Sequence, residues 1–175
     1  MSAEPRSYRL EQFPEKIAVV QLGPGAEVPD WAESSSLFSI TATALETSLV
    51  CAARNVPKKA KQAGPFTAFA VQGPLDFSLI GVLATLLQPL ADAEISVLTI
   101  STFDTDWLLV PVNDAERAGE VWRTAGHEVV VATPVLPGRT GAAKSADKTP
   151  NKPAHKAKTK PGTKPGTKPR ESHDR

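Results

Sequence analysis

Apolar residues follow two different periods along the chain, and the first part shows the period of two that is typical of β-strands. Residues 37–43 (LFSITAT) and 46–51 (ETSLVC) alternate between apolar and polar positions, and residues 16–22 (KIAVVQL) form a short apolar run. Such alternation predicts half-buried strands. Only Ala44 and Leu45 separate the two alternating runs, so we expect a tight hairpin, although the usual Asn-Gly turn is missing.

After residue 65 the apolar residues recur twice at the spacing of an α-helix. The two stripes are Leu79, Val82, Leu83, Leu86 and Leu90, and then Ala115, Ala118, Val121, Trp122 and Ala125. Strand-like runs flank them at residues 66–73, 95–102, 106–112 and 127–133. This βαββαβ order predicts an α+β, ferredoxin-like domain with a four-stranded antiparallel sheet and both helices on one face. The other face needs a cover, which the first half of the chain or a second copy could supply.

The ends of the predicted helices carry recognisable signals. Asp76 or Ser78 can cap the first helix, which follows a turn that contains both residues. Asn113 can cap the second helix, with Glu116 completing a capping box. Gly126 should close the second helix, because glycine takes the positive φ that such an end requires.

Composition divides the chain into a folded body and a tail. Residues 57–64 are polar and bounded by prolines, which is typical of a linker. We therefore expect a β-rich module at residues 13–56 and the βαββαβ domain at residues 65–133. Residues 137–175 are rich in Lys, Pro, Gly and Thr and almost lack large apolar side chains, so we expect a disordered tail.

Charge follows the same division. Residues 1–136 hold nine Lys and Arg against sixteen Asp and Glu, a net charge of −7, whereas residues 137–175 hold eleven against three, a net charge of +8. A basic tail can make weak contact with polyanions. It has no aromatic residue on which bases could stack, and a solubilising extension is the other interpretation.

The single cysteine and the N-terminus indicate in which cellular compartment the protein is expected. Cys51 has no cysteine partner, so an intrachain disulfide is excluded, and its apolar neighbours Leu49 and Val50 predict a buried side chain. The N-terminal residues lack the apolar core of a signal peptide, and no apolar run approaches the ~18 residues of a membrane helix. We expect a cytoplasmic protein without membrane contact.

Few residues could carry catalysis. His127 begins a predicted strand, where a surface or strand-end role is expected, and His155 and His173 lie in the tail. No catalytic triad, phosphate-binding loop or HExxH motif is present in the sequence. Asp104 and Asp106 lie two residues apart at a turn, but a calcium loop needs more oxygen ligands at regular spacing. We expect no enzyme, no metal site and no cofactor.

Two turns have the chemistry of a binding site. The turn at residues 73–78 leads into a helix, whose first N–H groups and dipole favour a carboxylate or phosphate, although a plain helix cap is the competing interpretation. The turn at residues 102–106 carries two carboxylates. If the two turns are adjacent, together they suit a zwitterion, with an aspartate for its amino group. The sequence leaves that adjacency open.

These two turns also carry a resemblance to a known family. Residues 71–111 (VQGPLDFSLIGVLATLLQPLADAEISVLTISTFDTDWLLVP) resemble small bacterial ACT-domain proteins, and RTAGHEV at residues 123–129 matches their helix-to-strand ending. The hairpin of the first half fits more loosely. The resemblance covers about residues 13–132, and such chains are similar to the half-unit of the cytosolic arginine sensor of animals, which carries tandem ACT repeats.

The resemblance implies a non-catalytic regulatory protein. ACT domains generally bind amino acids or other small effectors between domains or chains, and they often regulate an enzyme or a transport system. It implies a truncated ACT-like first module, a ligand between modules or between chains, and a homo-oligomer. A structural module that dimerises without a ligand is the alternative. Carried over by motif, the ligand-binding positions are Asp76, Phe77, Ser78, Gly81, Thr102, Phe103 and Asp106. Asp104 is interpreted as a turn residue that bonds its own backbone.

The sequence departs from the family pattern in three places. An acidic motif after the third strand is replaced by Ala52-Ala53-Arg54, which reverses its charge. The usual glycine after the first helix is Glu94. Leu79 stands where the arginine sensor has an acidic side chain in its ligand-binding helix. A smaller or more apolar amino acid is therefore as good a candidate as arginine.

Overall fold

The computed structural model describes residues 6–32 and 35–133, and the predicted tail lies outside these residues. Its strands are β1 (Arg9–Leu22), β2 (Ser39–Ala42), β3 (Thr47–Ala52), β4 (Lys61–Val71), β5 (Leu98–Ser101), β6 (Asp106–Pro111) and β7 (Glu128–Val131). Its α-helices are α1 (Val82–Asp92) and α2 (Ala115–Thr124). Short 3-10 turns lie at Asp30–Ala32, Ala53–Asn55 and Val112–Asp114. In the described residues no helix is long and apolar enough to cross a membrane.

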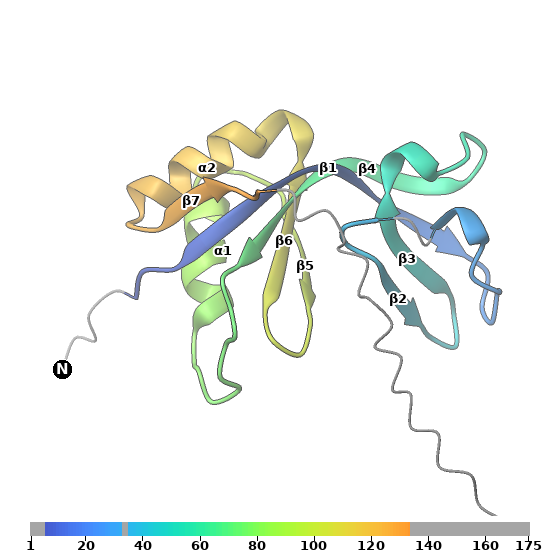
Figure 1. Ribbon diagram of the computed structural model, residues 1–175, viewed down its shortest axis with the longest axis horizontal. Coiled ribbons are helices and arrows are strands. Elements are labelled where there is room, and N and C mark those ends of the chain that lie inside the picture. Colours follow the sequence, from blue (N-terminus) through green and yellow to red (C-terminus); the bar gives the residue numbers. More distant parts are fainter. Residues whose placement is uncertain (1–5, 33–34, 134–175) are drawn as a thin grey trace, which may run out of the picture. The chain divides into compact units, whose positions relative to one another are not determined.

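The seven strands form one sheet, which is organised around the long strand β1. The order is β2-β3-β1-β4-β6-β5, and β7 pairs with β1 in parallel. The beginning of β1, Arg9–Gln12, lies between β7 and β4, and its end, Ile17–Leu22, lies between β3 and β4. Figure 1 shows β1 and β4 running side by side from the two helices to the β2–β3 hairpin.

The structure confirms the predicted βαββαβ order from β4 to β7 but corrects its sheet. The sheet of this domain is not a separate four-stranded one, because Arg9–Gln12 lies between β4 and β7 and contributes a fifth strand. The sequence does not predict this strand because it is mostly polar, with Leu10 as its only fully buried apolar residue. Strand β4 also begins at Lys61, so residues 61–64 of the expected linker are strand.

Both helices pack on one face of the sheet. Phe69 of β4 and Leu108 of β6 point into this core, where they meet buried residues of α1 and α2. The Trp122 and Phe69 rings lie edge to face with centroids 4.8 Å apart, and the indole Nε1 of Trp122 donates a 2.9 Å hydrogen bond to the carbonyl of Leu86. The predicted apolar stripes therefore point inward, except that Ala125 is exposed and Leu79 lies before the start of α1.

The first half of the chain covers part of the opposite face. Ala68 and Leu109 of the βαββαβ part belong to one buried cluster with Leu37 and Val50. The first half of the chain is therefore one cover of this face, as predicted. The other candidate, a second copy of the chain, is not part of this structure. A smaller core in the first half contains Cys51, which is buried as predicted, and burial raises the pKa of its thiol.

The predicted starts of the two helices are both wrong. Asp76 and Ser78 do not cap α1, because this helix begins only at Val82, after Gly81 with φ +83°. The capping box at Asn113 and Glu116 does not form, because a 3-10 turn runs through Val112–Asp114 and α2 starts without a side-chain cap.

The predicted glycine end of α2 is confirmed. Gly126 takes φ +91°, its N–H donates to the Arg123 carbonyl at 3.0 Å, and the N–H of His127 reaches the Trp122 carbonyl at 2.9 Å. These two bonds make a Schellman motif.

Candidate functional site

The two turns that the sequence could not place lie against each other. The N–H of Leu75 donates a 2.8 Å hydrogen bond to the carbonyl of Asp104, and the hydroxyl of Thr105 donates to the carbonyl of Val71. Gly73 is required at this contact, since a Cβ there would lie 2.5 Å from the Asp104 carbonyl oxygen. The turn that leads into α1 is therefore fastened to the β5–β6 hairpin through backbone groups.

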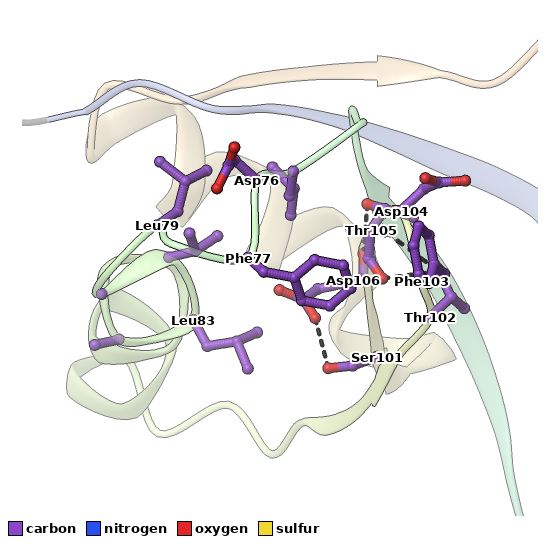
Figure 2. A pocket seen from close by; sticks show the side chains of 14 residues that line it. Asp76, Phe77, Leu79, Leu83, Ser101, Thr102, Phe103, Asp104, Thr105 and Asp106 are labelled. Atoms are coloured by element: carbon purple, nitrogen blue, oxygen red, sulfur yellow. Dashed lines mark hydrogen bonds between the residues drawn. The ribbon is translucent and has the colours of Figure 1, made fainter.

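A cleft of about 400 Å³ lies between these turns and the first turn of α1. Its lining residues come from the turn and helix start, at positions 75–77, 79 and 81–84, and from the hairpin, at positions 101–106. Figure 2 shows leucines of the helix side facing the hairpin across the cleft, with the Phe77 ring between them. These lining residues all belong to the βαββαβ part of the chain, which is the second half of its folded body.

Asp106 lines this cleft because of its place in the alternation of β6. Leu108 points into the core beneath the helices, and Trp107 and Leu109 point to the opposite face. Asp106 shares the face of Leu108, so its carboxylate lies on the helix side of the sheet. There Ser101, directly opposite on β5, donates a 2.6 Å hydrogen bond from its hydroxyl to the Asp106 carboxylate.

The side-chain hydrogen bond that closes the hairpin turn comes from Thr102 and not, as expected, from Asp104. The Thr102 hydroxyl bonds the carbonyl of Thr105 at 2.9 Å, and the Thr105 N–H donates to that hydroxyl at 3.3 Å. Thr102 thus makes the side-chain turn that was predicted for Asp104. Within the described residues the Asp104 side chain makes no hydrogen bond, and its carbonyl instead accepts from Leu75.

Residues at the start of α1 line the cleft, and glycine precedes them. A Cβ at Gly81 would have no heavy atom within 4 Å, so the left-handed φ of +83°, not a close contact, explains the glycine. The next three residues, Val82, Leu83 and Ala84, line the cleft. In an α-helix the first N–H groups have no intrahelical acceptor, so this end favours a negatively charged group.

Two aromatic rings lie at the mouth of the cleft. Phe77 and Phe103 pack edge to face with centroids 5.1 Å apart and planes at 76°. They are nonetheless 76% and 79% exposed, and the nearby Ile80 is 90% exposed. Large apolar side chains are normally buried, so this exposed group marks a surface that another molecule can cover.

The charge of the cleft is entirely negative. Asp76, Asp104 and Asp106 line it, and none of the described Lys, Arg or His residues does. The Asp76 carboxylate accepts a 2.8 Å hydrogen bond from the N–H of Ser78, and bonding to Ser78 lowers the Asp76 pKa. Among the residues that the structure describes, no cluster of three His, Cys, Asp or Glu is arranged to hold a metal ion.

The cleft brings together most, but not all, of the predicted site residues. Those that line it are Asp76, Phe77, Gly81, Thr102, Phe103 and Asp106. Ser78 does not line it, although its N–H donates a hydrogen bond to the Asp76 carboxylate. Sequence reasoning missed Ser101, which the hairpin register places opposite Asp106. It also missed Thr105, whose bond to Val71 no local signal announces.

Two family models match parts of the chain. Residues 64–122 match the model of the ACT domain, and residues 15–59 match a second model, described as an N-terminal domain. No curated protein matches the sequence.

Solved structures resemble the chain over most of its described length. A protein from Agobacterium tumefaciens has 29% sequence identity and a TM-score of 0.68, and the match covers 73% of this chain and 96% of that one. A Vibrio cholerae protein of unknown function, described as a possible transport protein, has 17% identity and a TM-score of 0.58, covering 68% and 90%.

An aspartate kinase from Clostridium acetobutylicum, described as an allosteric enzyme, has 12% identity and a TM-score of 0.52. This match covers 66% of the present chain but only 34% of the kinase, so the likeness concerns the fold of one part of that enzyme. Together with the βαββαβ order, the family model identifies residues 64–122 as an ACT domain, and the Agobacterium tumefaciens structure resembles the chain over 73% of its length.

Proposed function

We propose that this protein is a non-catalytic regulator that binds an amino acid in the cleft between α1 and the β5–β6 hairpin. The observation that carries the proposal is that Asp106 and the first residues of α1, whose N–H groups lack intrahelical acceptors, line the same cleft. An amino acid carries the opposite charges on its two ends, so one molecule can satisfy both walls.

The proposed ligand lies at an interface between two copies of the chain. All lining residues come from the second half, which argues against a site between the two halves. The exposed rings of Phe77 and Phe103 stand at the open side, where a second copy would bury them. ACT domains are regulatory modules, and the regulated partner is proposed to be an enzyme or a transporter.

A thermal-shift screen of the twenty amino acids tests this function. A ligand at 100 times its dissociation constant should stabilise the protein by about 2.7 kcal/mol. Asp106→Asn should abolish the shift. Asp92→Asn is the control and should retain it, because Asp92 is an exposed residue of α1 that lies outside the cleft and accepts a hydrogen bond from Gln88. The absence of a shift with any amino acid at millimolar concentration would contradict the proposal.

A second candidate function is an interaction module that dimerises without a ligand. The exposure of Phe77, Ile80 and Phe103 supports it, because large apolar side chains are normally buried and the Phe77 and Phe103 rings lie together. Size-exclusion chromatography with light scattering distinguishes the two functions. A dimer that Phe103→Ser dissociates, with no effect of any amino acid on stability, would favour the interaction module.

A further inference from the structure

Strand β7 has only one neighbour in the sheet that the structure describes. Its four residues, Glu128–Val131, pair with the beginning of β1, which on its other side pairs with β4. Figure 1 shows β7, in orange, alongside this part of β1, in blue. None of the four residues is buried, and Val131 is 70% exposed. An edge strand with little apolar burial opens more easily than the strands of the core, so the polar contacts between β1 and β7 decide how firmly it is held.

One of these contacts depends on a side chain that can titrate. The Nδ1 of His127 accepts a 3.2 Å hydrogen bond from the N–H of Tyr8, directly before the first residues of the two paired strands. The next contact is a 2.9 Å hydrogen bond from the N–H of Glu128 to the Tyr8 carbonyl. An imidazole nitrogen therefore serves as the acceptor for a backbone N–H at the start of the β1–β7 pair.

Only the neutral form of His127 can make this bond. In a neutral imidazole that accepts at Nδ1 the proton is on Nε2, whereas in the protonated ring both nitrogens are donors. Protonation therefore places an N–H group at Nδ1 opposite the N–H of Tyr8, with no acceptor between them. The hydrogen bond at the start of the β1–β7 pair is lost, and two hydrogens repel each other in its place.

The surroundings of the His127 ring do not favour its protonated form. The side chain is buried, and within the described residues neither its Nε2 nor the neighbouring Tyr8 hydroxyl has a hydrogen-bond partner. The two rings pack with their centroids 5.9 Å apart. Burial lowers the His127 pKa, and a backbone contact with Thr85 of α1, which lacks the geometry of a full hydrogen bond, offsets this only in part.

The charged groups on the surrounding elements do not compensate a proton on this ring either. Arg9 and Glu11 of β1 and Glu128 of β7 alternate with core residues, so they point to the face of the sheet away from the helices, where Arg9 and Glu128 form a 3.0 Å ion pair. The end of α2 carries Arg123, which has the same sign as a protonated histidine, and α1 has only Asp92, its last residue. None of these groups contributes to the lowered pKa. A buried charge without a partner is costly, so the ring takes up a proton where it can reach water.

We propose that His127 is a pH-sensitive switch whose protonation separates β7 from β1 while the rest of the sheet stays folded. The separation leaves Arg9–Gln12 with an unpaired strand edge. In the open form the ring is in water, where a histidine has its ordinary pKa of about 6.5. Since the closed form binds the proton less tightly, the fraction of open molecules rises as the pH falls below about 6.5, by at most about tenfold for each pH unit.

Native-state hydrogen exchange of the full chain, measured by NMR from about pH 7.5 to about pH 5, tests the switch. The amides to follow are those of Glu128 and Ala132, which donate to Tyr8 and Gln12 across the β1–β7 pair, and the amides of β6 are the reference. After correction for the intrinsic effect of pH on exchange, we expect both to be less protected than β6 and to lose at least about threefold of their protection over this range. Low concentrations of urea should not change their exchange, because a local opening exposes little surface.

Two variants separate the titrating contact from its neighbours. His127→Asn keeps an acceptor for the Tyr8 N–H without a titration in this range, so the protection of the two amides should no longer depend on pH. Ser7→Ala removes a 2.7 Å hydrogen bond to the Gly126 carbonyl beside the same contact, so it should lower their protection at every pH and leave the dependence on pH intact.

The switch is overturned if the amides of Glu128 and Ala132 are as well protected as those of β6 at about pH 5, because β7 then opens only with the whole fold. It is overturned equally if acid lowers their protection as much in His127→Asn as in the unchanged protein. The His127 ring gives a readout that needs no variant. Its NMR titration in the folded chain should show a pKa below 6.5, and an ordinary or raised pKa contradicts the proposal.

Discussion

The two helices lie on the same core, but the structure fastens them differently. α2 is held by Trp122, whose indole bonds the backbone of α1, and it closes on a glycine. α1 begins without a side-chain cap beside the candidate cleft and closes on Glu94, which takes φ +56°. Trp122 and Gly126 thus fasten α2, while the candidate site lies at the start of α1.

The largest effect is expected from removing the anchor of α2. Trp122→Ala should lower the free energy of unfolding by about 3–5 kcal/mol, because it empties a fully buried site and removes the Phe69 ring contact. Leu83→Ala, on the cleft side of α1, is the matched change and should cost less than half as much, since Leu83 is only partly buried. Urea unfolding measures both, and equal losses would contradict the asymmetry.

The next effect concerns the turn that leads into α1. Gly73→Ala should cost about 1–3 kcal/mol, because the new Cβ meets backbone atoms of Asp104 and the two turns must separate. Gly23→Ala is the control, because a Cβ there has no heavy atom within 4 Å. The same variants, titrated with any amino acid that binds, show whether the cleft depends on this contact.

A smaller loss is expected at the end of α2. Gly126→Ala forces a side chain into the left-handed region and should lower the free energy of unfolding by about 1–2 kcal/mol. Equilibrium unfolding in urea measures the change. No loss would mean that the Schellman motif at Gly126 does not stabilise α2.

A substitution at the corresponding end of α1 should instead raise the free energy of unfolding. The N–H of Ile95 bonds the Leu90 carbonyl at 2.9 Å and that of Glu94 the Ala91 carbonyl at 3.0 Å, so this end is also a Schellman motif. Glu94→Gly should therefore stabilise the protein by about 1 kcal/mol, because glycine takes this φ without strain. A thermal melt at neutral pH checks the direction, and destabilisation would show that Glu94 makes a contact that outweighs its strain.

The smallest expected effect is a dependence of stability on pH that arises from His127, the residue after Gly126. Its Nδ1 accepts a 3.2 Å hydrogen bond from the Tyr8 N–H, and its side chain is only 6% exposed. Burial lowers the His127 pKa below its ordinary 6.5, and a backbone contact with Thr85 opposes this only in part. The unfolded chain therefore binds more protons at mildly acidic pH, and stability falls as the pH drops below about 6.5.

His127→Asn provides the comparison for this pH dependence. Asparagine keeps an acceptor for the Tyr8 N–H and has no titration in this range. The difference in unfolding midpoint between the two proteins should shrink as the pH falls from about 8 to about 5. A difference that stays constant over this range would show that the His127 pKa is the same in the folded and unfolded states.

Much of the ACT part could be predicted from the sequence because its signals are local. The leucine stripe of α1 and the tryptophan face of α2 have helical spacing, and Leu86, Leu90 and Trp122 are fully buried. The end of α2 followed from Gly126. The capping residues failed, because an Asp or Ser near a helix start signals a cap only when the helix begins there, and Gly81 delays the start of α1.

The residues of the candidate site could be predicted from the sequence, but their arrangement in space could not. Asp106, Thr102 and Phe103 were identified from a motif, and β6 alternation explains why Asp106 lies on the helix side. That the hairpin meets the turn at Gly73 depends on a backbone bond between Leu75 and Asp104. No periodicity or motif encodes a bond between backbone groups so far apart in the chain.

The sequence by itself determined the order of strands and helices, the faces that they bury and the residue types available to a site, because these follow from spacing and side-chain chemistry. Only the tertiary structure decided that Arg9–Gln12 enters the second half between β4 and β7, and that two distant turns enclose one cleft. Both are long-range pairings of backbone groups. Since every residue except proline offers the same N–H and C=O, the choice of partner is made by the packing of the whole sheet.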